Sequence, residues 1–127
     1  MKNGGFSLSR RLASFKYAFQ GIRRLFAQEA NARIHAVAAG CAVAAGFWLD
    51  ISAQEWLAVV IVIGAVFAAE GFNSAVEALG DAVSSDYNLQ VKHAKDLAAG
   101  AVLLTAIAAA ITGLIIFTPK IFGCISA

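Results

Sequence analysis

The longest apolar stretch of the sequence, residues 97–119, contains no ionisable side chain. A helix needs about 20 apolar residues to cross the hydrocarbon core of a bilayer, so this stretch predicts a transmembrane helix. Residues 34–49 and 56–69 are also apolar, and the helical pattern of the latter runs on through residue 83. We therefore expect an all-α membrane protein, a single domain over residues 1–127, with spanning helices at about residues 34–50, 55–83 and 96–118.

A soluble helical bundle is the alternative for the two shorter stretches. Hydrophobic residues make up 60% of the chain and charged residues 14%, a balance outside that of soluble domains. A soluble domain of 127 residues has too little interior to bury three such segments. The composition therefore favours the membrane. The net charge of the chain, +2, is too small to predict a nucleic-acid partner.

Residues 6–30 have a different pattern, that of an amphipathic helix. Apolar side chains recur there at spacings of three and four, and Arg and Lys lie opposite or beside them; the apolar positions are Leu8, Leu12, Phe15, Phe19, Ile22 and Phe26. Such a helix is typical of one that lies on an anionic membrane surface. A helix that packs on its neighbours is the other interpretation, and the two are compatible.

The distribution of Lys and Arg predicts the orientation in the membrane. Of the ten such residues, seven lie in residues 2–33, and Lys92 and Lys95 lie between the second and third spans, whereas residues 50–55 contain none. By the positive-inside rule, the amino terminus and the loop between the second and third spans face the cytoplasm. The short turn and the carboxyl end then lie outside, with Trp48 and Trp56 on either side of that turn. Separately, Pro119 is expected to end the third span.

A stripe of polar residues continues the second span, within roughly 100° of arc on a helix; its members are Glu70, Asn73, Ser74, Glu77 and Asp81. With a rise of about 1.5 Å per residue, Glu70 lies roughly 21 Å from the outer entry at Trp56, near the cytoplasmic headgroups. Glu77 then lies at or beyond the inner interface. An ionisable group at the depth of Glu70 is costly and suggests a function.

Three interpretations of this stripe remain open from the residues alone. The polar groups could join helices, with small residues allowing close contact (Gly64, Gly71, Ala75 and Ala78). A transporter could use Glu70 to couple ions or protons. An enzyme could use Glu70 as a general base facing a membrane substrate, with Glu77 holding a metal.

Charged residues near the other two spans favour nucleotide chemistry. Glu29 and Arg33 share a helical face by their i,i+4 spacing, and Lys95 and Asp96 stand at the edge of the third span. Carboxylates that hold a divalent cation and basic groups that neutralise phosphates are what MgATP chemistry requires. The sequence has no G-x-x-x-x-G-K-[ST] and no G-x-G-x-x-G motif, so a nucleotide site would be assembled from helix ends.

The histidines and cysteines carry weaker signals. His35 and His93 are expected in surface or capping roles near the cytoplasmic interface. Cys41 and Cys124 have no metal or redox spacing and are expected as small buried hydrophobes.

Several segments together resemble the bacterial integral-membrane diacylglycerol kinase and undecaprenol kinase family. The resemblance covers nearly the full length; it rests on SFKYAFQGI (14–22), EANARIH (29–35), WLD and EW around the outer turn, E-x-x-N-S-A-x-E-x-x-x-D (70–81) and AKDLAAGAVL (94–103). It implies a surface helix followed by three spanning helices, assembled as a homotrimer. It also implies transfer of the γ-phosphate of MgATP to the primary hydroxyl of a membrane lipid in the bacterial inner membrane, for phospholipid metabolism or lipid-carrier recycling.

The resemblance also assigns roles to individual positions. Glu70 matches the catalytic base, and Glu29 and Glu77 match the carboxylates that hold Mg²⁺ and ATP. Further polar positions of the catalytic or nucleotide site are matched by Asn73, Asp81, Lys95, Asp96, Arg10 and Tyr17. Asp86 stands in a nucleotide-binding loop where some members have Glu. Ala13 and Phe15 receive no role. The carboxyl-terminal GLIIFTPKIF and the early SFKYAFQGI resemble the undecaprenol kinase branch more, whereas WLD before the outer turn is also seen in the diacylglycerol kinase branch. On balance the resemblance slightly favours undecaprenol as the acceptor.

Overall fold

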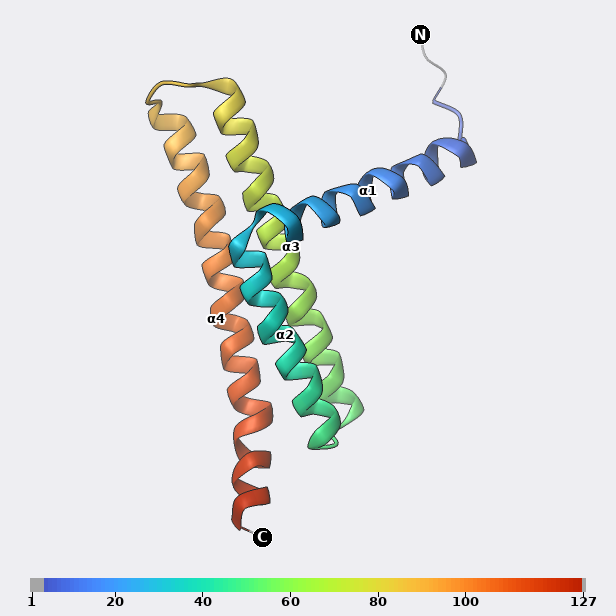
Figure 1. The fold of residues 1–127 in the computed structure, drawn as a ribbon, viewed down its shortest axis with the longest axis vertical. Helices are drawn as coiled ribbons and strands as arrows, with labels where there is room; N and C mark the ends of the chain where they lie inside the picture. Colours follow the sequence, from blue (N-terminus) through green and yellow to red (C-terminus); the bar gives the residue numbers. More distant parts are fainter. Residues whose placement is uncertain (1–3, 127) are drawn as a thin grey trace.

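The computed structural model describes residues 4–126 as four helices joined by short connections (Figure 1). They are α1 (Leu8–Gln28), α2 (Ala30–Trp48), α3 (Ala53–Val83) and α4 (Leu89–Ser126). Over these residues there is no β-strand. The prediction of an all-α chain is therefore confirmed, and the expected end of the second span at residue 83 coincides with the end of α3.

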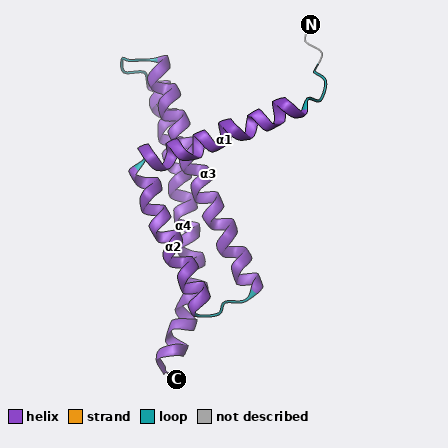
Figure 2. Cartoon of the chain, turned by 45° about the vertical axis from the view of Figure 1, so that its right-hand side comes forward, coloured by secondary structure: helices purple, strands orange, loops and turns teal. Residues whose placement is uncertain are grey.

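The long helices α3 and α4 form an antiparallel hairpin, and α2 lies beside the half of it farther from the α3–α4 loop (Figures 1 and 2). Both α3 and α4 are long and apolar enough to cross a membrane, whereas α2 is not among the helices that meet this test. The early turns of α2 contain the polar residues Asn31, Arg33 and His35, which lower its apolar content. Two of the three expected spanning helices are thus long and apolar enough to cross a membrane.

The boundary between α1 and α2 falls at Glu29. Its backbone is extended (φ −104°, ψ 112°), so the chain changes direction there. The amide of Glu29 still donates to the Leu25 carbonyl at 3.0 Å, and its own carbonyl accepts from Arg33 at 3.3 Å. The break therefore leaves both helix ends hydrogen-bonded at this residue.

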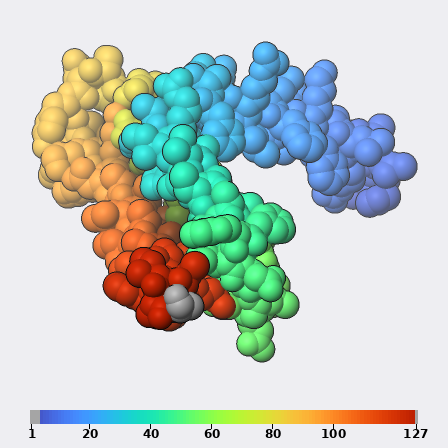
Figure 3. Space-filling model, turned by 60° about the horizontal axis from the view of Figure 1, so that its bottom comes forward, coloured from blue at the N-terminus to red at the C-terminus, as the bar shows by residue number. Residues whose placement is uncertain are grey.

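On the amino-terminal side of this break, the first half of α1 extends away from the other helices as a separate arm (Figures 1 and 3). The end of α1 packs on α3, where Leu25 is buried and the rings of Phe26 and Phe67 meet edge-on at 5.2 Å. The rest of the apolar stripe, from Leu8 to Ile22, is exposed. Packing on the chain's own helices therefore accounts for one end of the amphipathic helix only.

A tight turn joins α2 to α3 at the end of the molecule opposite the α3–α4 loop (Figure 2). Asp50 takes the left-handed conformation (φ 50°), and Ile51 is buried behind it. Gly46 faces the indole of Trp56 so closely that an added Cβ would lie 2.7 Å from the ring. Trp56 therefore packs inside the turn, whereas Trp48 is exposed as an interfacial aromatic residue would be.

The start of α3 is fixed by a capping box. The Ser52 hydroxyl accepts from the Glu55 amide at 3.2 Å, and the Glu55 carboxylate accepts from the Ser52 amide at 3.0 Å. Lys120 of α4 pairs with the same carboxylate at 3.3 Å. The turn is therefore tied to the far end of α4.

Two expectations about apolar residues are wrong. Pro119 does not end the third span, because α4 continues through it to Ser126 and the Lys120–Glu55 pair holds the following turn. Proline is tolerated in membrane helices where neighbouring groups support the backbone. Cys41 and Cys124 are exposed rather than buried, since most apolar side chains of α2 and α4 face outward, as in a helix surrounded by lipid or other subunits.

Candidate active site

Glu70 lies in α3 at the level where α1 crosses the hairpin, and only 2% of its surface is exposed. Oε1 of Glu70 lies 3.2 Å from Nε2 of His35 in α2. The contact is within ion-pair distance, but the imidazole N–H does not point closely enough at Oε1 to form a hydrogen bond. The expectation that His35 has only a surface or capping role is therefore wrong. His35 is partly buried and faces the proposed base.

Two further buried polar atoms lie on the same stripe as Glu70. The Asn73 Oδ1 and Ser74 Oγ atoms, like Glu70 Oε1, have no hydrogen-bond partner among residues 4–126. Buried polar groups are nearly always paired, and each unpaired one costs about 1–3 kcal/mol. Three such atoms within two turns of one helix indicate a place where a ligand, water or another subunit completes the hydrogen bonding.

Farther toward the α3–α4 loop, Lys95 of α4 joins two carboxylates of α3. Its Nζ lies 2.7 Å from Oδ1 of Asp81 and 3.3 Å from Oε2 of Glu77. The hydrogen bond to Asp81, and next the one to Glu77, raise the pKa of Lys95 above its usual value. Lys95 precedes the apolar stretch of α4, and Glu77 and Asp81 are 47% and 72% exposed. Lys95 is therefore a cation held at an accessible surface.

Glu29 borders a groove between α1 and α3. The groove has a volume of about 290 Å³, and its polar lining comes from Arg24, Gln28, Glu29 and Ser74. The side chain of Glu29 makes no cap hydrogen bond at the start of α2. Glu29 is the N-cap of α2, its carbonyl accepts from the Arg33 amide, and within residues 4–126 the two side chains form no ion pair.

These carboxylates fit Mg²⁺ bound together with a nucleotide better than a metal held by protein alone. Residues 4–126 contain no group of three His, Cys, Asp or Glu side chains placed to hold a metal. Mg²⁺ usually keeps several waters and takes one or two carboxylates together with substrate phosphates. Glu29 on its groove and the half-exposed Glu77 are oxygen donors of that kind.

The remaining candidate residues lie outside the Glu77–Asp81–Lys95 cluster. Asp96 pairs with Lys92 one turn earlier in α4, at 2.6 Å. Asp86 lies in the α3–α4 loop, where its carbonyl accepts from the Ser84 hydroxyl. Arg10 and Tyr17 are exposed on the arm of α1, which extends away from the hairpin (Figure 3). A single chain therefore does not bring these two residues to Glu70 or Glu77.

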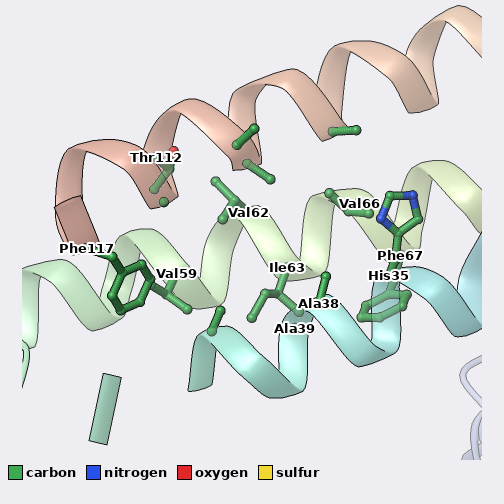
Figure 4. A pocket seen from close by; sticks show the side chains of 15 residues that line it. His35, Ala38, Ala39, Val59, Val62, Ile63, Val66, Phe67, Thr112 and Phe117 are labelled. Carbon is green, nitrogen blue, oxygen red and sulfur yellow. The ribbon is translucent and has the colours of Figure 1, made fainter. Parts of the chain in front are cut away.

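On the other side of His35, an apolar cavity of about 260 Å³ runs between α2, α3 and α4. Figure 4 shows His35 and Phe67 at one end and Val59 and Phe117 at the other. Ala38 and Ala39 of α2 leave the space open along its side. The cavity thus leads from the part of the helices near the α2–α3 turn to the imidazole that contacts Glu70.

The contact between His35 and Glu70 was not predicted from the sequence, although the lengths of the two helices give one indication of it. The two helices are antiparallel and joined by a tight turn, so residues at similar separations from that turn lie at similar heights. His35 and Glu70 stand at separations from Asp50 and Ile51 that differ by about one helical turn. The sequence alone does not determine which faces of α2 and α3 meet.

Comparisons with known proteins identify the family. The sequence model described as prokaryotic diacylglycerol kinase matches residues 16–117. Undecaprenol kinase of Bacillus subtilis is 38% identical over 90% of this chain and 93% of that protein. Diacylglycerol kinase of Escherichia coli K12 is 33% identical over 88% and 92%, and the Synechocystis diacylglycerol kinase is 37% identical over 88% and 65%. The chain therefore belongs to the prokaryotic diacylglycerol kinase family and is a membrane lipid kinase.

Proposed function

We propose that the chain transfers the γ-phosphate of ATP to the primary hydroxyl of a membrane lipid alcohol, at the cytoplasmic face of the bacterial inner membrane. The observation that carries this proposal is the arrangement along α3. A buried carboxylate with an unpaired oxygen, Glu70, lies at the level of α1, and a charged cluster lies about two to three turns beyond it. If α1 rests in the membrane interface, Glu70 lies at headgroup depth and the cluster in water.

Glu70 is the proposed general base. Its carboxylate accepts the proton of the lipid hydroxyl as the hydroxyl oxygen forms a bond to the γ-phosphorus. The bond between that phosphorus and the bridging oxygen of ADP breaks, and ADP leaves with the bond electrons. Burial of Glu70 keeps bulk water away from the transferring group, and the unpaired oxygens of Asn73 and Ser74 supply polar contacts that can orient the hydroxyl.

The cluster beyond Glu70 is the proposed phosphate end of the site. Lys95 neutralises charge on the phosphates of ATP, and Asp81 holds its ammonium in place at 2.7 Å. Glu29 and Glu77 are the proposed Mg²⁺ ligands. When bound, Mg²⁺ offsets the negative charge of the ATP phosphates. Asp86 and Asp96 lie near this end of the hairpin and are proposed to contact the nucleotide.

A homotrimer would complete the nucleotide site. Arg10 and Tyr17 lie on an arm that leaves its own hairpin, so we place them at the site of a neighbouring subunit. The exposed apolar faces of α2, α3 and α4 provide surface for such contacts as well as for lipid. The groove along Gly71, Ala75 and Ala78 supplies small residues where another helix could approach.

Undecaprenol is the proposed acceptor, in preference to diacylglycerol. The undecaprenol kinase of Bacillus subtilis is 38% identical to this chain, against 33% for the Escherichia coli diacylglycerol kinase. The apolar cavity ending at His35 would present the alcohol end of an apolar chain toward Glu70. The product would return a lipid carrier to cell-envelope synthesis, whereas phosphorylation of diacylglycerol would feed phospholipid synthesis.

The test is a reconstitution of the purified chain in liposomes with MgATP and either lipid alcohol. We expect phosphorylation of undecaprenol at the higher kcat/KM, and loss of about 10²- to 10⁴-fold in kcat in Glu70→Gln, the range of general acid–base catalysis. If neither alcohol is phosphorylated at a rate that Glu70→Gln abolishes, the proposal is wrong. A higher kcat/KM for diacylglycerol would overturn the choice of acceptor alone.

A further inference from the structure

His35 is the one basic side chain of residues 4–126 in close contact with the carboxylate of Glu70. Its Nε2 lies 3.2 Å from Oε1. Lys95, the basic residue of the charged cluster, is paired with Asp81 and Glu77 instead. Whatever orients Glu70 within a single chain therefore comes from α2, through His35.

A buried glutamate needs such a partner. Glu70 is 2% exposed and its Oε1 has no hydrogen bond. An unpaired buried carboxylate is costly, and three side-chain torsions leave its direction free. Because His35 is on a different helix and partly buried, its ring provides a fixed point against which the carboxylate can be held.

We propose that His35 is a positioning residue for the phosphoryl transfer, an inference that rests on the proposed function. Nε2–H of His35 donates to Oε1 of Glu70, and Oε2 is left to accept the proton of the lipid hydroxyl. The 3.2 Å contact lacks hydrogen-bond geometry in the structure and becomes a hydrogen bond when the substrate is bound, as catalytic hydrogen bonds commonly tighten in the substrate complex. The imidazole also borders one end of the apolar cavity, so on the proposed function His35 lies between the lipid chain and the reacting carboxylate.

Three substitutions separate positioning from simple packing. Glutamine places its amide nitrogen near the position of Nε2, so His35→Gln keeps the donor. Asparagine is shorter and polar, and leucine fills space without a donor. We expect His35→Asn and His35→Leu to lower kcat about 10- to 100-fold, the scale on which misplaced catalytic groups act. The KM for MgATP should stay within about twofold, because the phosphate end of the site is unchanged.

His93→Leu is the matched control, since His93 is exposed on α4 and no ion pair joins it to Glu70 within residues 4–126. It should retain the kcat of the wild type. His35→Gln should recover most of the kcat lost in His35→Asn. The inference is overturned if His35→Leu retains wild-type kcat, or if His35→Gln is as impaired as His35→Leu.

A second measurement does not depend on activity. The chain has two histidines, so ¹⁵N labelling of histidine gives few imidazole signals, and His93→Leu assigns them. We expect Glu70→Gln to shift the Nε2 signal of His35 and leave that of His93 unchanged. An unchanged His35 signal overturns the inference even if the kinetic variants are inactive.

The outcomes also separate this inference from the proposed function. If the wild type phosphorylates no lipid alcohol, the proposed function fails and the catalytic use of His35 fails with it. If the wild type is active and Glu70→Gln is inactive, but His35→Asn and His35→Leu are fully active, only the role of His35 is wrong.

Discussion

Gly80 of α3 lies directly under the side chain of Lys95 in α4. A Cβ added at Gly80 would lie 3.0 Å from Cε of Lys95, and 3.0 Å from Cγ1 of Val91. Contacts this short require a neighbour to move. The absence of a side chain at position 80 therefore allows Lys95 to cross α3 and reach both Asp81 and Glu77.

Gly80→Ala tests whether the placement of Lys95 matters for catalysis. The Lys95 side chain is flexible, whereas Val91 is β-branched and stiff at χ1. We therefore expect Lys95 to move away from its carboxylates and Val91 to be displaced only slightly. A loss of about 1.4 kcal/mol in its interaction would lower kcat/KM for MgATP about tenfold. Steady-state kinetics measures this. Gly64→Ala is the control, since a Cβ there would meet nothing within 4 Å; equal activity of the two variants would contradict the prediction.

The proposed Mg²⁺ ligands predict a different response to metal from that of the base. Glu77→Gln removes charge from a half-exposed carboxylate, so more Mg²⁺ should be needed for half-maximal rate and high Mg²⁺ should restore part of the activity. Glu29→Gln should behave alike, whereas Glu70→Gln should stay inactive at every Mg²⁺ concentration. Initial rates against free Mg²⁺ at fixed ATP provide the measurement. Rescue of Glu70→Gln by Mg²⁺ would reverse the assigned roles.

Sharing of the site between subunits predicts complementation. A chain with Arg10→Ala and Tyr17→Ala lacks the arm residues, and a chain with Glu70→Gln lacks the base. If a neighbour's arm completes each site, unfolding and refolding the two chains together should produce some intact sites and recover part of the activity. Each chain refolded alone is the control. Mixtures no more active than the separate chains would place Arg10 and Tyr17 outside a shared site.

The capping box predicts a stability change without a catalytic one. Ser52→Ala removes the acceptor for the Glu55 amide, and loss of an N-cap costs about 0.5–2 kcal/mol. Because this turn is at the opposite end of α3 from the Lys95 cluster, kcat should be unchanged while the midpoint of thermal unfolding in detergent falls. Ser85→Ala, in the exposed α3–α4 loop, is the control. A Ser52→Ala protein as stable as Ser85→Ala would contradict the role of the cap.

The helices were predictable where local pattern decides them. The polar stripe extends a spanning helix to residue 83, and α3 ends there. The grouping of Glu77 and Asp81 with Lys95 follows from one hairpin with a short loop. Resemblance to the kinase family supplied the reaction, which the stripe alone left open among packing, transport and catalysis.

The features that escaped prediction depend on contacts between distant segments. No proline or glycine marks the break at Glu29; it follows from the packing of Leu25 and Phe26 across α3. Pro119 is a local signal for a helix end, but the pair between Lys120 and Glu55 holds the next turn. His35 gains its significance from the face of α2 that meets Glu70, and hydrophobic periodicity in α2 does not specify that face.

The hairpin of α3 and α4 runs well past the level of α1 before it turns (Figure 1). On the proposed mechanism, the part of the hairpin beyond α1 lies in water. ATP can therefore bind there while the lipid alcohol stays in the bilayer and needs no extraction from it. The γ-phosphorus meets the alcohol oxygen beside Glu70, and the rest of the nucleotide extends along the turns of α3 that lead to Lys95 and its carboxylates in water.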